Sequence, residues 1–413
     1  MSIIAKQIQK TSQSRHSLQQ QSGKIINAVL AGFATELIKQ ARSVIRANQK
    51  DLSRMDPLNP LYDRLLLNEE RLKQIARAIR KVIKLKDPSG QLLEQRRLGN
   101  GILLEKRTVP LGVVAAIFES RPNVVADISA LCIKSRNAAV LKGSKDADHT
   151  NRAIVGIIHN VLKKNNLPAA LILLLPPDRE VVHELFTATR YIDVIIPRGS
   201  NSLIQHVRAN SRVPVIETGA GVCHAYVHHE ANLEMAVKIV FNGRTSRPSV
   251  CNSIDSILVD KNIAAKFLPK MGDKLKEKSV VIYADKESYI HLKGYPHLKK
   301  ASKKDYYREF LSLACTVKIV KDQDEAMAHI EEHGTRHSEV IITKNRKAAN
   351  KFLEFVDAAT VYHNASTRFT DGEEFGLGAE VGISTQKLHA RGPFALEKLV
   401  TEKWVLKGHG EVR

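Results

Sequence analysis

The sequence predicts a soluble α/β protein of two domains, each built on a parallel sheet, with a small separate β element. Short apolar runs alternate with helical periods from residue 113 onward, and the alternation restarts after Cys251. Such alternation is typical of βαβ units, whose parallel strands are covered by helices on both faces. A chain of 413 residues is long enough for two or three domains. The β element is indicated by a glycine-punctuated stretch near residue 100.

The first ninety residues are predicted to be helical. Between Arg71 and Lys86, apolar residues recur every three or four positions, so that they share one face of a helix. Asn68 suits the start of this helix, because its side-chain oxygen can accept a hydrogen bond from a free N–H group. Between Gln91 and Pro110, the turn Gly99-Asn100-Gly101 separates two extended arms and predicts a β-hairpin.

Apolar runs of four to six residues mark the expected strands of both sheets. In the first domain they are residues 113–118, 138–141, 171–175 and 192–196. In the second domain they are residues 256–259, 280–283, 317–320, 340–343 and 359–362. No internal repeat or low-complexity linker interrupts the pattern, so we expect the domains to share an interface with the site between them.

Composition and charge exclude several classes of protein. The content of 43% hydrophobic and 26% charged residues is typical of a soluble globular chain. No apolar run is long enough for a membrane helix, and the first 21 residues lack the apolar core of a secretory signal, so we expect a cytoplasmic protein without a membrane partner. The net charge of +21 suits a phosphorylated substrate and cofactor. No nucleic-acid recognition motif accompanies the charge, so nucleic acid is not expected as a partner.

The four cysteines differ in their surroundings. They are too few and scattered for a disulfide framework, and none forms a C-x-x-C pair, so reduced thiols are expected. Cys132 and Cys315 have apolar neighbours and Cys223 begins a strand, as is usual for structural thiols. Cys251 lies in the polar stretch 247–253 and is the candidate nucleophile, because a reactive thiolate needs a polar, partly exposed setting. A buried small residue is the alternative interpretation.

Two other motifs are incomplete. The dinucleotide-binding pattern G-x-G-x-x-G is absent between a strand and a helix, and Gly219-Ala220-Gly221 lacks the third glycine. A nicotinamide cofactor would therefore bind without the usual glycine turn. His224, His228 and Glu230 alternate along one strand face, but histidines on strands are commonly just hydrogen-bonded, and no metal is expected.

Several blocks of the sequence resemble one enzyme family. The segment Asn242–Asn252 resembles the catalytic loop of the γ-glutamyl phosphate reductases, also called glutamate-5-semialdehyde dehydrogenases, which belong to the aldehyde dehydrogenase superfamily. The other matching blocks are residues 110–123, 130–135, 196–204, 213–219 and 364–393. Ordinary aldehyde dehydrogenases lack the block Glu119-Ser120-Arg121-Pro122-Asn123 and the long last block, so the resemblance is specific to the reductases.

The resemblance implies an aldehyde dehydrogenase-like fold with two Rossmann-like α/β domains. It also implies NADPH-dependent reduction of L-glutamyl 5-phosphate to L-glutamate 5-semialdehyde and phosphate, the second step of proline biosynthesis from glutamate. The cofactor-binding domain would cover residues 1–90 and 111–220, and the catalytic domain residues 221–385. An oligomerisation element would consist of residues 91–110 and 386–413.

The matched positions carry implied roles in catalysis and cofactor binding. Cys251 would form a thioester with loss of phosphate, and Asn123 with the Cys251 backbone N–H would stabilise the oxyanion. A turn or helix cap is the alternative role for Asn123. Glu217, 34 residues before Cys251, stands where hydrolytic aldehyde dehydrogenases keep a general base, and it would be structural, cofactor-facing or catalytic. The implied cofactor-binding residues are Lys142, Gly199, Glu217, Glu309 and Phe310.

Arginine side chains are the candidates for binding the phosphate and carboxylate of the substrate, because a planar guanidinium pairs with such groups through two hydrogen bonds. The implied substrate-binding residues are Ser120, Arg121, Arg247 and Arg368. Surface salt bridges are the alternative interpretation for the arginines. The chain departs from the usual family residues at Arg136, Ser144, Ser200 and Val222, and lysine replaces the usual arginine at position 142. A positive φ at Arg136 would cost about 1 kcal/mol relative to glycine and could alter the edge of the cofactor pocket.

The resemblance also implies partners. We expect a homo-oligomer, and a separate glutamate kinase that supplies the labile acyl phosphate and associates with this protein. Two other functions stay open at this point. One is an oxidising aldehyde dehydrogenase that hydrolyses its thioester with Glu217, and the other is a basic, non-catalytic binding protein on the same fold.

Overall fold

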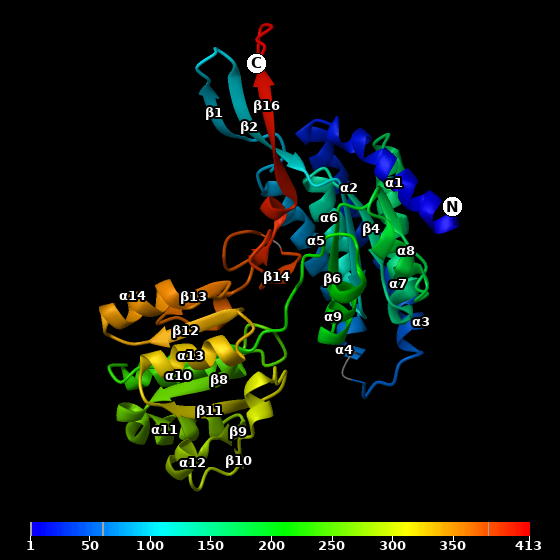
Figure 1. The fold of residues 1–413 in the computed structure, drawn as a ribbon. Coiled ribbons are helices and arrows are strands. Elements are labelled where there is room, and N and C mark those ends of the chain that lie inside the picture. Colours follow the sequence, from blue (N-terminus) through cyan, green and yellow to red (C-terminus); the bar gives the residue numbers. More distant parts are fainter. Residues whose placement is uncertain (1, 60–61, 379) are drawn as a thin grey trace. The chain divides into compact units, whose positions relative to one another are not determined.

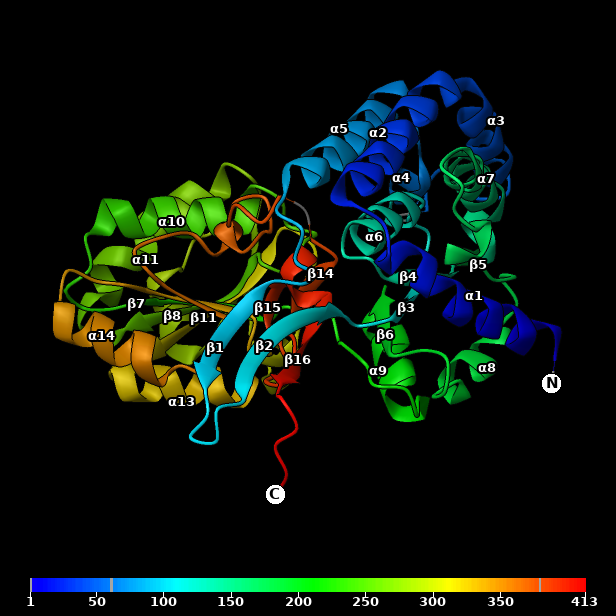
Figure 2. The same ribbon diagram turned by 90° about the horizontal axis from the view of Figure 1, so that it is seen from above.

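The computed structural model describes residues 2–59, 62–378 and 380–413, which divide into two compact units (Figures 1 and 2). Unit 1 comprises Met1–Thr218, Gly376–Gly382 and Phe394–Arg413, and unit 2 comprises Gly219–Phe375 and Ile383–Pro393. Each unit contains its own parallel sheet with helices packed against it. The predicted α/β fold with two parallel sheets is confirmed.

A four-stranded parallel sheet forms the core of unit 1, in the order β5-β4-β3-β6. Every residue of β3 and β4 is buried, as expected for strands covered on both faces. All four strands overlap the apolar runs that predicted them. Their bounds are β3 (Val113–Phe118), β4 (Ala138–Lys142), β5 (Ile172–Leu174) and β6 (Val194–Arg198). The helices that follow these strands are α6 (Asn123–Lys134), α7 (Asp148–Lys164), α8 (Val181–Thr187) and α9 (Asn201–Asn210).

Helices also occupy the start of unit 1, as predicted. The side chain of Asn68 accepts a hydrogen bond from the N–H of Arg71 and so caps α5. The apolar stripe of α5 is buried, and this helix packs against α2 and α6. The bounds are α1 (Ile3–Gln19), α2 (Gly23–Lys39), α3 (Ala41–Leu52), α4 (Tyr62–Leu65) and α5 (Glu69–Lys84).

A separate antiparallel sheet joins the predicted hairpin to the end of the chain. The hairpin strands β1 (Leu92–Arg97) and β2 (Leu103–Pro110) pair, and β16 (Val400–Lys407) pairs along the whole of β2. Of the segment 386–413, this sheet takes only β16. The short strands β14 (Gly382–Ser384) and β15 (Gly392–Phe394) form a further pair.

Unit 2 is built on a seven-stranded parallel sheet in the order β10-β9-β11-β8-β7-β12-β13. The central strand β8 is entirely buried. Its strands are β7 (Cys223–Val227), β8 (Ile254–Asp260), β9 (Val281–Ala284), β10 (Leu298–Lys300), β11 (Ala314–Val320), β12 (Ser338–Ile342) and β13 (Thr360–His363). Its helices are α10 (Leu233–Thr245), α11 (Lys261–Lys276), α12 (Lys286–His291), α13 (Gln323–His333) and α14 (Arg346–Phe355). The five predicted runs each overlap a strand, and β10 is a short, mostly exposed addition.

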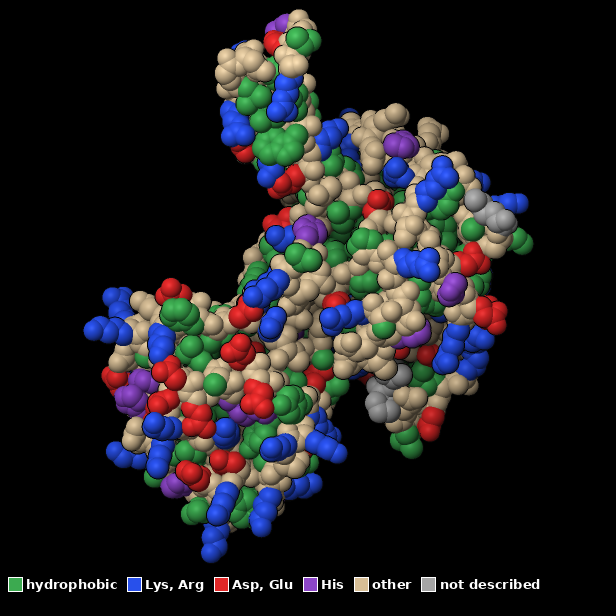
Figure 3. Space-filling model, viewed as in Figure 1, with side chains coloured by type: hydrophobic (Ala, Val, Ile, Leu, Met, Phe, Trp, Pro, Cys, Tyr) green, Lys and Arg blue, Asp and Glu red, His purple; other side chains and the backbone are tan. Residues whose placement is uncertain are grey.

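The surface shows how the excess positive charge is distributed. On the face seen in Figure 3, Lys and Arg side chains are interspersed with Asp and Glu and do not gather in one patch. Within the three described ranges, no helix has both the length and the apolar character needed to cross a membrane.

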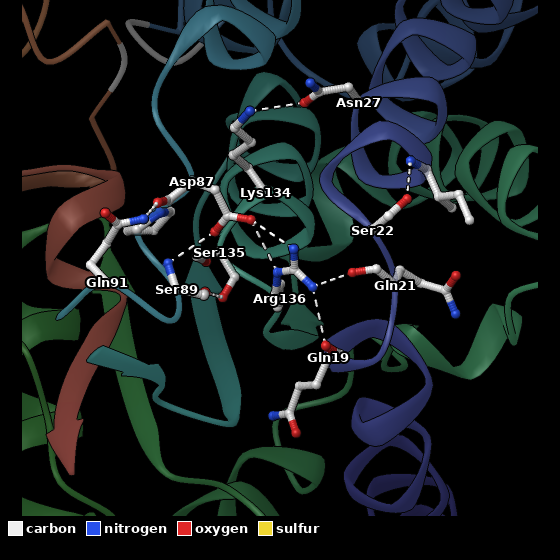
Figure 4. A network of polar contacts seen from close by, with 12 residues as sticks. Gln19, Gln21, Ser22, Asn27, Asp87, Ser89, Gln91, Lys134, Ser135 and Arg136 are labelled. Carbon is white, nitrogen blue, oxygen red and sulfur yellow. Dashed lines mark hydrogen bonds and ion pairs between the residues drawn. The ribbon is translucent and has the colours of Figure 1, made fainter. Parts of the chain in front are cut away.

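Arg136 has the positive φ that was considered for it from the sequence, with a value of 62° in the left-handed region. Its guanidinium forms an ion pair with Asp87 at 2.9 Å and donates hydrogen bonds to the carbonyls of Gln19 and Gln21 (Figure 4). These bonds offset the backbone strain and tie the end of α1 to the loop that follows α5. Arg136 precedes β4, whereas Lys142 ends it, so the two residues lie at opposite ends of one strand.

Candidate active site

Cys251 lies in the turn between α10 and β8, and its side chain is partly exposed. Burial raises the pKa of Cys132 and of Cys315 to about 12, and it raises the pKa of Cys223 well above its usual value. These three thiols therefore stay protonated at neutral pH. Among the described residues, Cys251 is the cysteine open to solvent, and its role as nucleophile stays a prediction.

The backbone around Cys251 is closely packed. The carbonyl of Cys251 accepts a hydrogen bond from the Cys223 thiol at 3.1 Å. The same carbonyl lies against the Cα of Gly221, so that a β-carbon on Gly221 would overlap it. The glycine that resembled part of a dinucleotide motif is thus required here by the close approach of the thiol-bearing turn.

Arg368 reaches the Cys251 turn from the distant segment after β13. Its Nη1 donates to the side-chain oxygen of Asn252, and its Nε donates to Ser246 Oγ at 3.1 Å. Burial lowers the pKa of Arg368 and the positive charge of Arg247 lowers it further, whereas Asp371 and, to a smaller extent, Cys251 raise it. Unit 2 therefore brings Cys251 together with Arg247 and Arg368, two of the three arginines predicted to bind substrate, whereas Arg121 lies in unit 1.

The segment predicted to contact the cofactor adjoins the same turn. Glu309 accepts a hydrogen bond from the N–H of Gly221 at 3.1 Å. Phe310 is buried and stacks on Tyr283, with their ring centroids 5.3 Å apart. Unit 2 thus places Glu309 one hydrogen bond from the glycine that packs on Cys251.

In unit 1, the block Glu119–Asn123 leads from β3 into α6. Ser120 adopts a φ of 36°, and its hydroxyl donates to Asp146 at 2.8 Å. Arg121 precedes α6, where its carbonyl accepts the N–H of Val124. A sparsely populated backbone conformation is common at functional sites, where surrounding bonds maintain it.

Asn123 is the first residue of α6. Its side-chain Nδ2 donates to Asp127 at 3.0 Å, which orients the amide and occupies one of its two donor hydrogens. Burial raises the pKa of Asp127 to about 6, although Asn123 and Arg198 oppose the shift. The N-cap of α6 is Pro122, so Asn123 does not cap this helix. Its oxyanion role stays a prediction, for a side chain that Asp127 already orients within unit 1.

The remaining predicted cofactor residues lie at or beyond the carboxyl ends of β4 and β6. The Lys142 Nζ donates to the Pro177 carbonyl at 2.9 Å, and burial lowers the pKa of Lys142. A β-carbon on Gly199 would overlap the carboxylate of Glu119. Glu217 forms an ion pair with Arg208 at 3.2 Å. The carboxyl edge of a parallel sheet is where ligands bind in open α/β folds, and Lys142 and Gly199 lie there.

Comparison with known proteins identifies the family. The model of the aldehyde dehydrogenase family matches residues 27–290. A gamma-glutamyl phosphate reductase of Chlorobium luteolum is 48% identical over 413 residues, which cover 99% of this chain and 98% of that protein. The chain belongs to the gamma-glutamyl phosphate reductases of the aldehyde dehydrogenase family.

Other relatives agree with this assignment. The reductase of Bacteroides thetaiotaomicron is 48% identical over 395 residues, covering 95% of this chain and 94% of that protein. The crystal structure of the Thermotoga maritima reductase matches with a TM-score of 0.96 and 37% identity over the full length of both chains. An acetylating aldehyde dehydrogenase of Geobacillus thermoglucosidasius, with 17% identity, a TM-score of 0.70 and coverage of 99% and 97%, shares the fold.

Three departures from the usual reductase residues have local structural roles. Ser200 caps α9, since its hydroxyl accepts the N–H of Leu203. The hydroxyl of Ser144 accepts the N–H of Ser120 at 3.2 Å. Val222 is buried, and its N–H donates to Thr335 Oγ1 at 2.9 Å. Two of these departures therefore lie beside residues predicted to bind substrate or cofactor.

The three residues weighed as a metal site do not form one group of ligands among the described residues, and of them only His224 lies within β7. His224 Nδ1 pairs with Glu339 inside unit 2, whereas His228 Nδ1 contacts Thr343 Oγ1 and the N–H of Glu230. A different group, His228, His229 and Asp260, places three possible ligand atoms within 4.8 Å of one another. The Asp260 carboxylate there already accepts hydrogen bonds from Tyr226, His229 and the backbone of α11. The expectation of no metal stays a prediction.

Sequence reasoning missed three residues that shape the turn. Gly221 was visible only as part of an incomplete glycine motif. Asn252 follows the thiol directly, but its bond to Arg368 joins positions 116 residues apart and could not be read from spacing. Arg244 is completely buried beneath the turn, although arginine is usually exposed, and nothing in its neighbours signals this.

Proposed function

We propose that the protein reduces L-glutamyl 5-phosphate to L-glutamate 5-semialdehyde with NADPH, through a thioester on Cys251, as the second step of proline biosynthesis. The observation that carries the proposal is the full-length similarity, near 50% identity, to proteins named gamma-glutamyl phosphate reductase. The partly exposed thiol beside two arginines supports the chemistry.

The reaction begins with attack of the Cys251 thiolate on the acyl carbon of the acyl phosphate. The new C–S bond forms as the C–O bond to the phosphoryl group breaks, and inorganic phosphate leaves. When bound, the nicotinamide cofactor supplies the hydride that reduces the acyl group. Return of the electron pair to sulfur then breaks the C–S bond and releases the aldehyde.

Donors aimed at the acyl oxygen stabilise the negative charge that develops in both steps. We assign these donors to the Asn123 side chain and the Cys251 backbone N–H. Asp127 supports the assignment, because its bond to Asn123 fixes the direction of the amide before substrate binds. The positive side chains of Arg121, Arg247 and Arg368, with the Ser120 hydroxyl, would bind the phosphate and the α-carboxylate.

The chain offers residues that suit a nicotinamide dinucleotide. The ammonium group of Lys142 is buried and donates a hydrogen bond to a carbonyl, and burial lowers its pKa. The negative charge of a bound phosphate would favour the protonated form of Lys142. Glu309 is a carboxylate suited to ribose hydroxyls, and Phe310, which is buried against Tyr283, would hold this segment in place beside the cofactor. Gly199 would allow close approach of the cofactor, and Glu217 would contact it. The 2′-phosphate of NADPH fits the positive charge of Lys142, although lysine grips phosphate less specifically than arginine.

The proposal extends to assembly and location. A homo-oligomer would form through the sheet of β1, β2 and β16, whose exposed apolar residues include Leu92, Trp404 and Leu406. Association with glutamate kinase would protect the labile acyl phosphate in transit. Cytoplasmic location follows from the biosynthetic role.

The test uses the reverse reaction. The wild type should reduce NADP⁺ with glutamate 5-semialdehyde only when inorganic phosphate is present, and Cys251→Ala should lose this activity by at least about a thousandfold. Cys315→Ala, which removes a buried thiol, is the control and should retain activity. Phosphate-independent reduction of NADP⁺ would instead identify an oxidising aldehyde dehydrogenase, and binding without turnover would identify a non-catalytic protein.

A further inference from the structure

Arg244 lies in the last turn of α10 and is completely buried. Its Nη1 donates to the Asp255 carboxylate at 2.7 Å and to the Ile254 carbonyl at 2.8 Å. Its Nη2 donates to the Pro248 carbonyl at 2.7 Å. One guanidinium therefore contacts the chain on both sides of Cys251, three residues before it and three residues after it.

Asp255 extends this contact to the segment predicted to meet the cofactor. The same carboxylate oxygen that accepts from Arg244 also accepts the N–H of Phe310 at 3.1 Å. A second link runs from Glu309 through the N–H of Gly221, whose Cα packs on the Cys251 carbonyl. The thiol-bearing turn and the segment 309–310 are thus joined by two separate chains of contact within unit 2.

Stability alone is a weak reason for a buried ion pair. Removing two charges from water costs several kcal/mol, and well-packed apolar side chains would often serve the fold equally well. The Nε of Arg244 is buried and has no hydrogen-bond partner among the described residues, so the site does not satisfy every donor of the group. Unlike apolar residues, the Arg244–Asp255 pair fixes the orientation of the backbone around it. Each of its hydrogen bonds holds one backbone carbonyl or N–H group in place.

We propose that Arg244 and Asp255 are positioning residues. They fix the position of the Cys251 sulfur relative to the nicotinamide-binding segment 309–310. The inference rests on the proposed function, because it assigns the reacting partners to these two segments. Neither side chain takes part in bond making. Their effect is on rate, because displacing reacting groups by about 1 Å can cost a hundredfold.

Arg244→Met tests the proposal, with Arg136→Met as the matched control. Arg136 also pairs with an aspartate and donates to two carbonyls, but it lies in unit 1 before β4. Arg244→Met should lower kcat about 10- to 100-fold, raise the KM for NADPH, and change the rate at which iodoacetamide alkylates Cys251. Arg136→Met should lower the melting temperature without changing these three quantities. Arg244→Lys should restore part of kcat, because lysine keeps the charge but cannot reach all three acceptors.

Asp255→Asn keeps the test usable if Arg244→Met does not fold, because its side-chain oxygen can still accept from Phe310. This variant should show a smaller change of the same kind in kcat and in the KM for NADPH. Wild-type kcat, KM and alkylation rate in a folded Arg244→Met or Asp255→Asn variant would overturn the proposal. The alkylation rate needs no substrate, so it tests the position of Cys251 even if the wild type proves to lack reductase activity.

Discussion

Gly221 illustrates how one residue determines the geometry of the thiol-bearing turn. It has no side chain, its N–H donates to Glu309, and its α-carbon lies against the Cys251 carbonyl. A glycine is needed here because another chain segment approaches closely, not because of a positive φ. Any larger residue must displace either the turn or the start of β7.

Gly221→Ala should therefore lower both activity and stability. We expect a loss of about 1 to 3 kcal/mol in the free energy of unfolding from overpacking, and a fall in kcat of at least roughly tenfold from displacement of Cys251. The measurement is chemical denaturation together with steady-state kinetics. Gly156→Ala is the control, because Gly156 lies on the exposed face of α7 with no neighbour near its missing β-carbon. It should be neutral or stabilising by up to about 1 kcal/mol, and equal effects of both substitutions would contradict the account.

The residues whose roles could be predicted were those whose neighbours along the chain indicate their chemical environment. The polar neighbours of Cys251 distinguish it from Cys132 and Cys315, whose neighbours along the chain are apolar. Arg244 and Asp255 could not be singled out, because their pairing depends on how α10, the turn and β8 pack in three dimensions. Charged residues are expected at the surface from composition alone, and only the fold shows which are buried.

At the scale of elements, β16 is joined to the hairpin by a buried carboxylate as well as by its strand pairing. Glu105 on β2 accepts hydrogen bonds from Arg107 at 2.6 Å, from Lys407 on β16 at 2.8 Å, and from Gln95 on β1 at 3.2 Å. Arg107 and Lys407 lower the pKa of Glu105 to about 2. Ionised Glu105 thus connects all three strands of this sheet.

The three-stranded sheet should respond to acid through Glu105. A lowered pKa means that the ionised form stabilises the folded sheet above the usual pKa of about 4.5, and that this contribution is lost as pH falls toward 2. Trp404, the single tryptophan of the sequence, lies on β16 and reports its detachment by fluorescence. Glu105→Gln should loosen β16 already at neutral pH and flatten the pH dependence between about 4.5 and about 2.

Glu402→Gln is the control for this titration, because Glu402 forms an ion pair with Lys106 on the same sheet but is exposed. Exposed pairs contribute little, so this variant should follow the wild type. An unchanged fluorescence titration in Glu105→Gln would show that the carboxylate does not hold β16.

Periodicity predicted most elements because it reports burial. The runs at 113–118 and 138–141 fall in strands that are buried throughout, and the stripe beginning at Leu72 lies on the buried face of α5. The strand β10 was not predicted, since it is short, lysine-rich and mostly exposed. The pairing of β16 with β2 joins residues some 300 positions apart, and no local pattern specifies such a partner.

At the scale of the whole molecule, the residues with predicted roles in the reaction are divided between the two units. Unit 2 holds Cys251 together with Arg247, Arg368 and the segment 309–310. Unit 1 holds Asn123 and Lys142 near the carboxyl edge of its own sheet. The resemblance to the reductases could be recognised from sequence blocks and is confirmed by full-length relatives. The roles of individual residues in the reaction depend on substrate and cofactor, and they stay proposals.

The most direct measurement asks whether Cys251 carries the acyl group. Glutamate 5-semialdehyde and NADP⁺ are mixed with the protein without phosphate, and the protein is digested for peptide mass spectrometry. We predict a burst of NADPH no larger than the amount of protein, a glutamyl thioester on the peptide containing Cys251, and its release when phosphate is added. A burst that persists in Cys251→Ser, or an acyl group found on another residue, would contradict the account.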